Sequence, residues 1–80
     1  MNRTVKRAIK RHDKDITSLV RKVTIKRLKS LDIDYVSHGD NIVSTRNKDV
    51  ERIYNEVMIE ILALMNRYQG KFHIIKQIYN

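Results

Sequence analysis

The 80-residue sequence has no cysteine, no proline and no tryptophan, and it has only two glycines. Without cysteine, the chain can form neither a disulfide nor a thiolate metal site, which fits a reducing compartment. The longest unbroken apolar run covers residues 61–65, far fewer than the roughly 20 residues that a membrane-spanning helix needs. Apolar residues near the N-terminus are scattered among charges and do not form the apolar block of a signal peptide. We therefore expect a cytoplasmic protein with no membrane partner.

What the chain does contain is enough apolar material for a core. Apolar residues make up 41% of the sequence and charged residues 32%, so we expect residues 1–80 to form a single small domain with a highly polar surface. A chain of this length lies near the lower limit for one hydrophobic core, and a homodimer would add buried area. The bias toward Ile, Lys and Asn is typical of AT-rich genes, among them those of many phages.

The positive charge is concentrated at one end of the chain. The first 30 residues hold 11 of the 17 Lys and Arg residues and only two acids, a net charge of about +9, whereas residues 31–80 carry about −1. Such asymmetry is typical of a surface that meets a polyanion, most often a nucleic acid. It indicates a class of partner, but neither a target sequence nor a pathway.

Residues 3–24 have the periodicity of an amphipathic helix. On a wheel at 100° per residue, the apolar residues fall within an arc of about 120°, and most of the bases fall opposite them. The apolar phase continues without a slip through the charged stretch in the middle, so we predict one long helix that ends near Lys29 or Ser30. The alternative is a flexible basic arm over residues 1–12, followed by a helix that Asp13 or Asp15 caps.

Residues 33–45 contain two short β-branched runs around Gly39 and Asp40. A glycine at the first central position suits a type II′ turn in a two-residue hairpin. That hairpin would pair His38 with Asn41, Val36 with Val43 and Tyr35 with Ser44. The alternative is a plain connection between two helices.

The strongest helical signal begins at Asn47, where apolar residues recur at three-and-four spacing. Asn47 is a credible N-cap and Gly70 a credible C′ residue for this second helix. Its apolar arc is broad, and Ile59 and Ala63 extend it. We therefore expect this helix to be the central core element.

The last ten residues, 71–80, fit two structures. Wheel geometry separates apolar from polar residues as in a helix, whereas a composition rich in Ile, Phe and Tyr favours a strand. We favour the strand, because a two-stranded hairpin alone is marginal in water and a third strand would support it. The predicted fold class is thus α+β, with two long helices, an intervening β-hairpin and a C-terminal strand. The alternative is an all-α helical hairpin with a short third helix.

The basic side of the first helix is the main candidate site. Because Asn and Gln are sparse on it, this side would contact the phosphates of a nucleic acid rather than its nucleobases. Tyr35 could stack on an unpaired nucleobase, which would favour RNA slightly over DNA. The predicted nucleic-acid-binding residues are Arg3, Lys6, Arg7, Lys10, Arg11, Lys14, Arg21, Lys22 and Tyr35. The same bases could instead meet an acidic protein, or an acidic surface of the same fold or of a dimer mate.

Signals for catalysis or for a metal are weak. His12, His38 and His73 have no ligand spacing, and His12 falls within the apolar arc, which indicates a partly buried imidazole. His38, Asp40 and Tyr35 could act as the acid, base and orienting group of a small ribonuclease, but no second sequence feature of such an enzyme accompanies them. The pair Glu56 and Glu60 could hold Mg²⁺, but salt bridges are the simpler interpretation, since Arg52 lies four residues before Glu56 and three after Asp49. We therefore expect no metal and no cofactor.

The sequence thus predicts a small non-enzymatic nucleic-acid-binding accessory protein. The alternative is a phage-type inhibitor or antitoxin-like protein that docks on another macromolecule and neutralises it.

Overall fold

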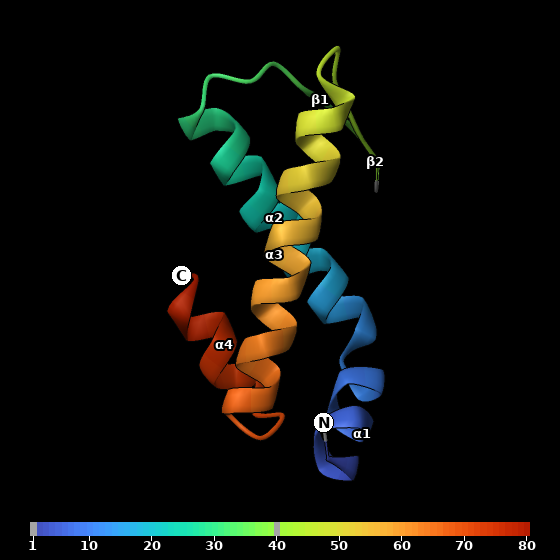
Figure 1. Ribbon diagram of the computed structural model, residues 1–80, viewed down its shortest axis with the longest axis vertical. Coiled ribbons are helices and arrows are strands. Elements are labelled where there is room, and N and C mark those ends of the chain that lie inside the picture. The colour runs from blue at the N-terminus through green and yellow to red at the C-terminus, as the bar shows by residue number, and fades with distance from the viewer. Residues whose placement is uncertain (1, 40) are drawn as a thin grey trace.

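The computed structural model describes residues 2–39 and 41–80. Figure 1 shows helices and a hairpin in an elongated molecule of 40 × 19 × 18 Å. The predicted α+β class, with an antiparallel hairpin between two helical parts, is confirmed. The elements are, in order, α1 (Arg3–Arg11), α2 (Asp13–Ser30), β1 (Val36–His38), β2 (Asn41–Val43), α3 (Asn47–Arg67) and α4 (Phe72–Ile78).

Helix α3 lies at the centre and contacts each of the other three helices, as the sequence predicts (Figure 1). Its residues Val57, Ile61 and Met65 are completely buried, and burial of each such side chain contributes about 1.5–3 kcal/mol. The prediction that Ile59 and Ala63 extend the buried arc is wrong: both are exposed, because α1, α2 and α4 cover only the opposite side of α3. No helix in the described part of the chain combines the length and the apolar character that crossing a bilayer requires.

The N-terminal helical segment is interrupted at His12, so the prediction of one long helix is wrong. His12 has φ −101° and ψ 17°, which ends α1 and precedes α2. Its ring stacks on Phe72 of α4 with 5.2 Å between centroids, and it is half-buried as predicted. The charges flanking the break suit two helix ends, since Lys10 and Arg11 lie in the last turn of α1 and acids in the first turn of α2. The side chain of Asn2 caps α1 by accepting a hydrogen bond from Val5 N at 2.8 Å, whereas the N-cap residue of α2, His12, makes no side-chain cap hydrogen bond.

Helices α2 and α3 both end in a left-handed turn. At the end of α2, Asp32 has φ 55°, and Ile33 N donates to Leu28 O at 3.0 Å, which places two buried apolar side chains together. At the end of α3, Gln69 has φ 55° and Gly70 N donates to Met65 O at 2.8 Å. The predicted end of α2 is confirmed. Gln69, not Gly70, occupies the C′ position of α3.

Glycine is nevertheless required at position 70. Its φ is +79°, and a Cβ atom there would lie 2.5 Å from Ala8 Cβ on α1. The helix α1 therefore packs directly on the turn between α3 and α4, with Val5 and Ala8 buried.

The hairpin has the predicted register. His38 pairs with Asn41 and Val36 with Val43, and Gly39 has φ +56°. The turn type also depends on Asp40, which lies outside the described residues. Among the described residues the ladder stops at Val36, so the predicted pairing of Tyr35 with Ser44 is wrong. Instead, the buried Ser44 hydroxyl donates to Asp34 O.

Two predictions for the second half of the chain need correction, one on the start of α3 and one on the structure of the last ten residues. Asn47 is the first residue of α3 rather than its N-cap, and its side chain accepts from Ser44 N at 3.1 Å. Residues 72–78 form a helix, so the predicted C-terminal strand is wrong. The turn at Gly70 directs the chain back along α3, where the i, i+3 pair Phe72 and Ile75 is buried, far from the hairpin that a third strand would have joined (Figure 1).

Candidate nucleic-acid interface

Helices α1 and α2 carry a surface of eight bases, which we call the basic face. Seven of these side chains are exposed, and that of Arg21 is half-buried. No ion pair links any of the seven exposed bases to a carboxylate within residues 2–39 and 41–80. The basic face consists of Arg3, Lys6, Arg7, Lys10, Arg11, Lys14, Arg21 and Lys22.

Asp49 and Glu56 of α3 are paired with basic side chains outside the basic face. Arg52 lies 3.3 Å from Glu56 and 3.7 Å from Asp49, and Arg46 lies 2.7 Å from Asp49. The predicted salt bridges of Arg52 are confirmed. Glu51 of α3 is exposed and forms no ion pair among the described residues.

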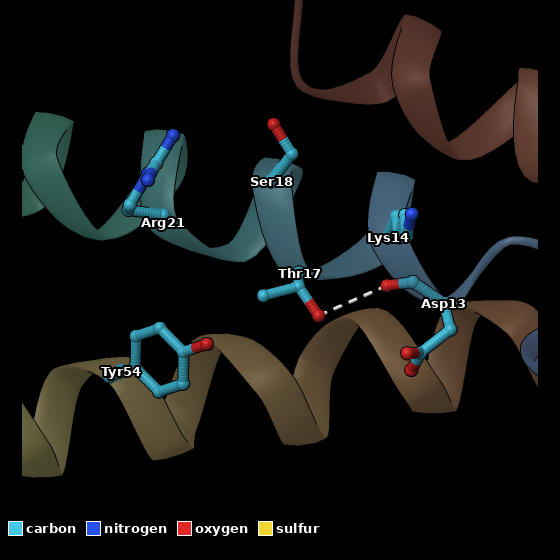
Figure 2. Close-up of a pocket in the computed structure, with 6 residues that line it drawn as sticks. All are labelled: Asp13, Lys14, Thr17, Ser18, Arg21 and Tyr54. Atoms are coloured by element: carbon cyan, nitrogen blue, oxygen red, sulfur yellow. Dashed lines mark hydrogen bonds between the residues drawn. The ribbon is translucent and has the colours of Figure 1, made fainter. Parts of the chain in front are cut away.

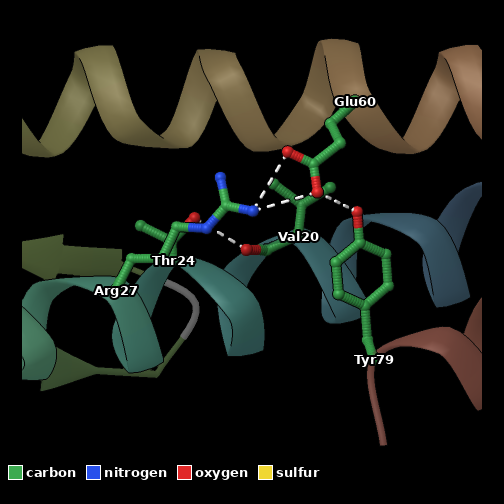
Figure 3. A network of polar contacts seen from close by, with 5 residues as sticks. All are labelled: Val20, Thr24, Arg27, Glu60 and Tyr79. Carbon is green, nitrogen blue, oxygen red and sulfur yellow. Dashed lines mark hydrogen bonds and ion pairs between the residues drawn. The ribbon is translucent and has the colours of Figure 1, made fainter.

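Arg27 differs from the basic face, because it points toward α3 (Figure 3). Its Nη2 donates to both oxygens of Glu60, at 2.9 and 3.0 Å, and the Tyr79 hydroxyl donates to Glu60 Oε1. The hydrogen bond from Tyr79 lowers the pKa of Glu60, burial opposes this effect, and Arg27 adds to the lowering. Burial, followed by the neighbouring Glu60, raises the pKa of Tyr79. This cluster ties α2, α3 and the C-terminal residues together.

The sequence contains a signal for this cluster. Arg27 falls on the apolar side of the wheel, and a base in that position needs an acidic partner on the facing helix. The identity of the partner depends on how α2 and α3 are aligned, which the periodicity of either helix alone does not define.

A groove of about 560 Å³ lies between α2 and α3. Figure 2 shows five of its residues on successive turns of α2 and Tyr54 opposite them on α3. Arg21 Nη1 donates to Gly39 O at 2.9 Å, so the hairpin holds this guanidinium beside the groove. The lining residues are Asp13, Lys14, Thr17, Ser18, Arg21 and Tyr54.

The groove brings together chemistry that could bind an anion. Lys14 and Arg21 supply positive charge, and Ser18 and Tyr54 supply hydroxyl groups. The Thr17 hydroxyl already donates to Asp13 O at 3.0 Å. Two of the predicted binding residues therefore line a concave surface rather than a flat helix face.

Tyr54 is the candidate residue that sequence reasoning missed. The periodicity assigns it to the apolar arc of α3, and it does pack partly against the core. It also lines a second hollow of about 370 Å³ beside Asn41 and Asn55. The wheel gives no signal for such a role, because Tyr54 lies near the middle of the apolar arc of residues 50–68, where a core position is expected.

Tyr35 lies elsewhere. It precedes β1, at the opposite end of the molecule from α1 (Figure 1), and lines a hollow with Asp32, Asp34 and Lys29. The two carboxylates make this an unfavourable approach for phosphate. The structure thus brings Lys14 and Arg21 together in one groove and separates Tyr35 from them.

The histidines occupy three different elements or junctions. His12 lies between α1 and α2, the exposed His38 lies on β1, and His73 lies on α4. In the portion that the structure describes, no three His, Cys, Asp or Glu side chains gather as a metal site requires. The ribonuclease hypothesis includes Asp40, which lies outside the described residues.

The fold and the charge distribution carry the functional argument. Neither Tyr54 nor the basic face corresponds to a short motif with an assigned chemistry. The chain matches no family model, no curated protein and no solved structure in comparisons with known proteins.

Proposed function

We propose that this chain is a small, non-enzymatic nucleic-acid-binding protein that acts in the cytoplasm. The observation that carries the proposal is the basic face, whose seven exposed bases have no carboxylate partner among the described residues. Like charges one turn apart on a helix cost a few tenths of a kcal/mol per pair. A bound polyanion would offset that repulsion along both helices.

The dimensions of the basic face suit a phosphate backbone. Arg3 and Arg11 on α1, and Lys14 and Lys22 on α2, are each eight residues apart, which corresponds to roughly 12 Å along each helix at the helical rise of about 1.5 Å per residue. The molecule is 40 Å long, and both helices contribute to this length (Figure 1). Contacts with several successive phosphates are therefore geometrically feasible, and they would give affinity with modest sequence specificity.

A salt titration tests the proposal. We expect binding to labelled RNA or duplex DNA to weaken roughly a thousandfold between 50 and 200 mM salt if about six phosphates are neutralised. Fluorescence anisotropy with the full chain measures this directly. Weak binding at 50 mM salt, or an affinity that does not change with salt, would contradict the proposed function.

An acidic protein could satisfy the same bases, as an inhibitor or antitoxin-like function would require. The groove favours nucleic acid, because it adds hydroxyl groups and an aromatic ring to the positive charge. Pull-down from nuclease-treated lysate separates the two functions: a stoichiometric protein partner that survives the treatment would favour protein docking.

A further inference from the structure

The groove between α2 and α3 is continuous with the basic face. Lys14 and Arg21 belong to both, so a strand that follows the basic face passes the groove. Its volume of about 560 Å³ falls within the range of roughly 300–1,000 Å³ that small-molecule sites occupy. A duplex keeps its bases inside the helix, whereas an unpaired nucleotide can place its base in such a hollow.

Tyr54 offers a surface for that base. Its ring is half-buried, packs against the core and lies between two hollows, so it is held in place while remaining accessible. Stacking on a tyrosine tolerates any base, because every base has a π face. The Tyr54 hydroxyl has no hydrogen-bond partner among the described residues, so it can also donate to a ligand oxygen.

Asp13 is an unexpected neighbour for a phosphate. It has no ion-pair partner in the described parts of the chain, and its carboxylate would repel a phosphate oxygen. A carboxylate accepts hydrogen bonds, and the ribose 2′-hydroxyl is a donor that RNA has and DNA lacks. A ribose beside Asp13 would therefore turn an unfavourable charge into a favourable contact.

From these observations we propose that the groove binds one unpaired ribonucleotide of a single-stranded RNA. The base stacks on Tyr54, Lys14 and Arg21 attract the flanking phosphates, and Asp13 accepts the 2′-hydroxyl. This inference rests on the proposed function, and it adds a preference for single strands over duplex and for RNA over DNA.

Two variants of Tyr54 test the stacking. Tyr54→Leu keeps apolar bulk but removes the ring, and we expect it to weaken binding to an oligouridylate by about tenfold. Tyr54→Phe keeps the ring and should stay within about twofold of wild type on the same oligonucleotide. Binding to duplex RNA, which the basic face alone would govern, should change by less than about twofold in either variant. The inference is overturned if Tyr54→Leu binds the oligouridylate as tightly as wild type does, or if its affinities for the oligouridylate and for duplex RNA fall by the same factor.

Tyr54 also packs against the core, so Tyr54→Leu can affect folding as well as binding. A second experiment therefore uses the wild-type protein. It consists of photocrosslinking to an oligouridylate that carries 4-thiouridine, followed by peptide mapping. We expect the crosslink in the peptide that contains Tyr54. A crosslink confined to the peptide that contains Tyr35 would overturn the inference.

Asp13 and Asp15 form a matched pair for the ribose contact. Both lie in the first turn of α2, but Asp15 faces another hollow, beside Lys22 and Lys76. Asp13→Asn should reduce the preference for oligouridylate over oligodeoxyuridylate by about fivefold, because the 2′-hydroxyl then donates to a neutral amide oxygen instead of a charged carboxylate, which is a weaker hydrogen bond. Asp15→Asn removes the same charge and should leave the preference unchanged. An equal effect of the two variants on the preference overturns the role of Asp13.

The outcomes separate this inference from the proposed function. If wild-type protein binds neither single-stranded RNA nor duplex in a salt-dependent way, the proposed function fails. If it binds both with equal affinity, and Tyr54→Leu changes neither, the proposed function stands and the ribonucleotide site fails.

Discussion

Helix α2 carries bases in two different environments. Arg27 points toward α3, where Glu60 and Tyr79 receive it, whereas Lys14 and Lys22 point to solvent with no carboxylate partner among the described residues. The side chains of Arg27 and Glu60 are only 36% and 42% exposed. Positive charge therefore holds the fold together on one side of the helix and is left available on the other.

The difference shows why net charge alone is a poor guide to a binding surface. The N-terminal 30 residues contain 11 bases, but the structure removes Arg27 from the available set by pairing it. The opposite charges of an ion pair largely cancel at a distance, whereas exposed basic side chains without an ion-pair partner keep their long-range field at moderate salt. The useful quantity is the positive charge that remains after internal pairing. Among the described residues it extends along α1 and α2, and in the second half of α2 it includes the exposed Lys22, Lys26 and Lys29.

The largest effect should come from detaching α1, which carries five of the eight basic residues of the basic face, without changing any charge. Gly70→Ala places a Cβ atom 2.5 Å from Ala8 Cβ at a position with φ +79°. We expect a loss of about 2–4 kcal/mol in the free energy of unfolding, because overpacking and a left-handed backbone both cost energy. Chemical denaturation followed by circular dichroism measures this loss.

Gly39→Ala is the matched control. Gly39 also has a positive φ of +56°, but a Cβ atom added there would meet no atom of the described residues within 4 Å, its chain neighbours aside. This substitution should lower the free energy of unfolding only by the cost of a left-handed backbone conformation, about 1 kcal/mol. Equal losses for the two variants would show that the contact between α1 and the α3–α4 turn is not formed in solution.

Local patterns in the sequence predict much of this fold. The wheel of residues 3–24 places the bases opposite the apolar arc, and the turn chemistry around Gly39 predicts the hairpin register that the structure has. Periodicity misses the break at His12 because the apolar phase is the same on both sides of it. Composition misses the short helix α4 because burial of Phe72 and Ile75 against α3 outweighs their strand propensity.

The candidate site is less accessible to sequence reasoning. Helical periodicity locates the basic face, because one helix is enough to define it. Tyr54, Asp13 and Arg21 meet only because α2 packs on α3 in a particular alignment, with the hairpin carbonyl of Gly39 holding the guanidinium. Contacts between elements distant in the sequence depend on tertiary packing, which no local pattern contains.

The next effect concerns affinity. The triple variant Lys6→Gln, Lys10→Gln, Arg11→Gln removes three exposed bases from α1, and we expect roughly hundredfold weaker binding to RNA near 100 mM salt. The slope of log affinity against log salt should become shallower by about 2 to 3. Stability should change little, because these side chains pair with no carboxylate among the described residues.

The control for this variant removes three bases outside the basic face. Lys48, Lys71 and Lys76 are exposed, and their replacement by Gln gives the same net charge as the first triple variant. We expect a slope within about 1 of the wild-type value. Similar losses in both triple variants would mean that net charge, rather than the basic face, determines binding.

A smaller effect should follow from Tyr79→Phe, which tests the structural side of the comparison. Tyr79 donates to Glu60 Oε1, and loss of a hydrogen bond to a partly exposed carboxylate should cost about 1 kcal/mol of stability. Thermal unfolding measures the change. The salt slope of RNA binding should be the same as in wild type, since the basic face is untouched; a shallower slope would show that the cluster and the basic face are not independent.

The smallest effect is the pH dependence of that cluster. The folded pKa of Glu60 lies below its usual value of about 4.5, so its contribution to stability is present above that pH and is lost as the pH falls through the folded pKa. The pKa of Tyr79 is raised above its usual value of about 10, so its contribution is present below pH 10 and declines as the pH rises above it. The stability difference between wild type and Tyr79→Phe should therefore be constant from about pH 5 to 9 and shrink on both sides. A difference that stays constant from about pH 3 to 11 would mean that the hydroxyl and the carboxylate do not interact, because only a group whose pKa changes on folding can make stability depend on pH.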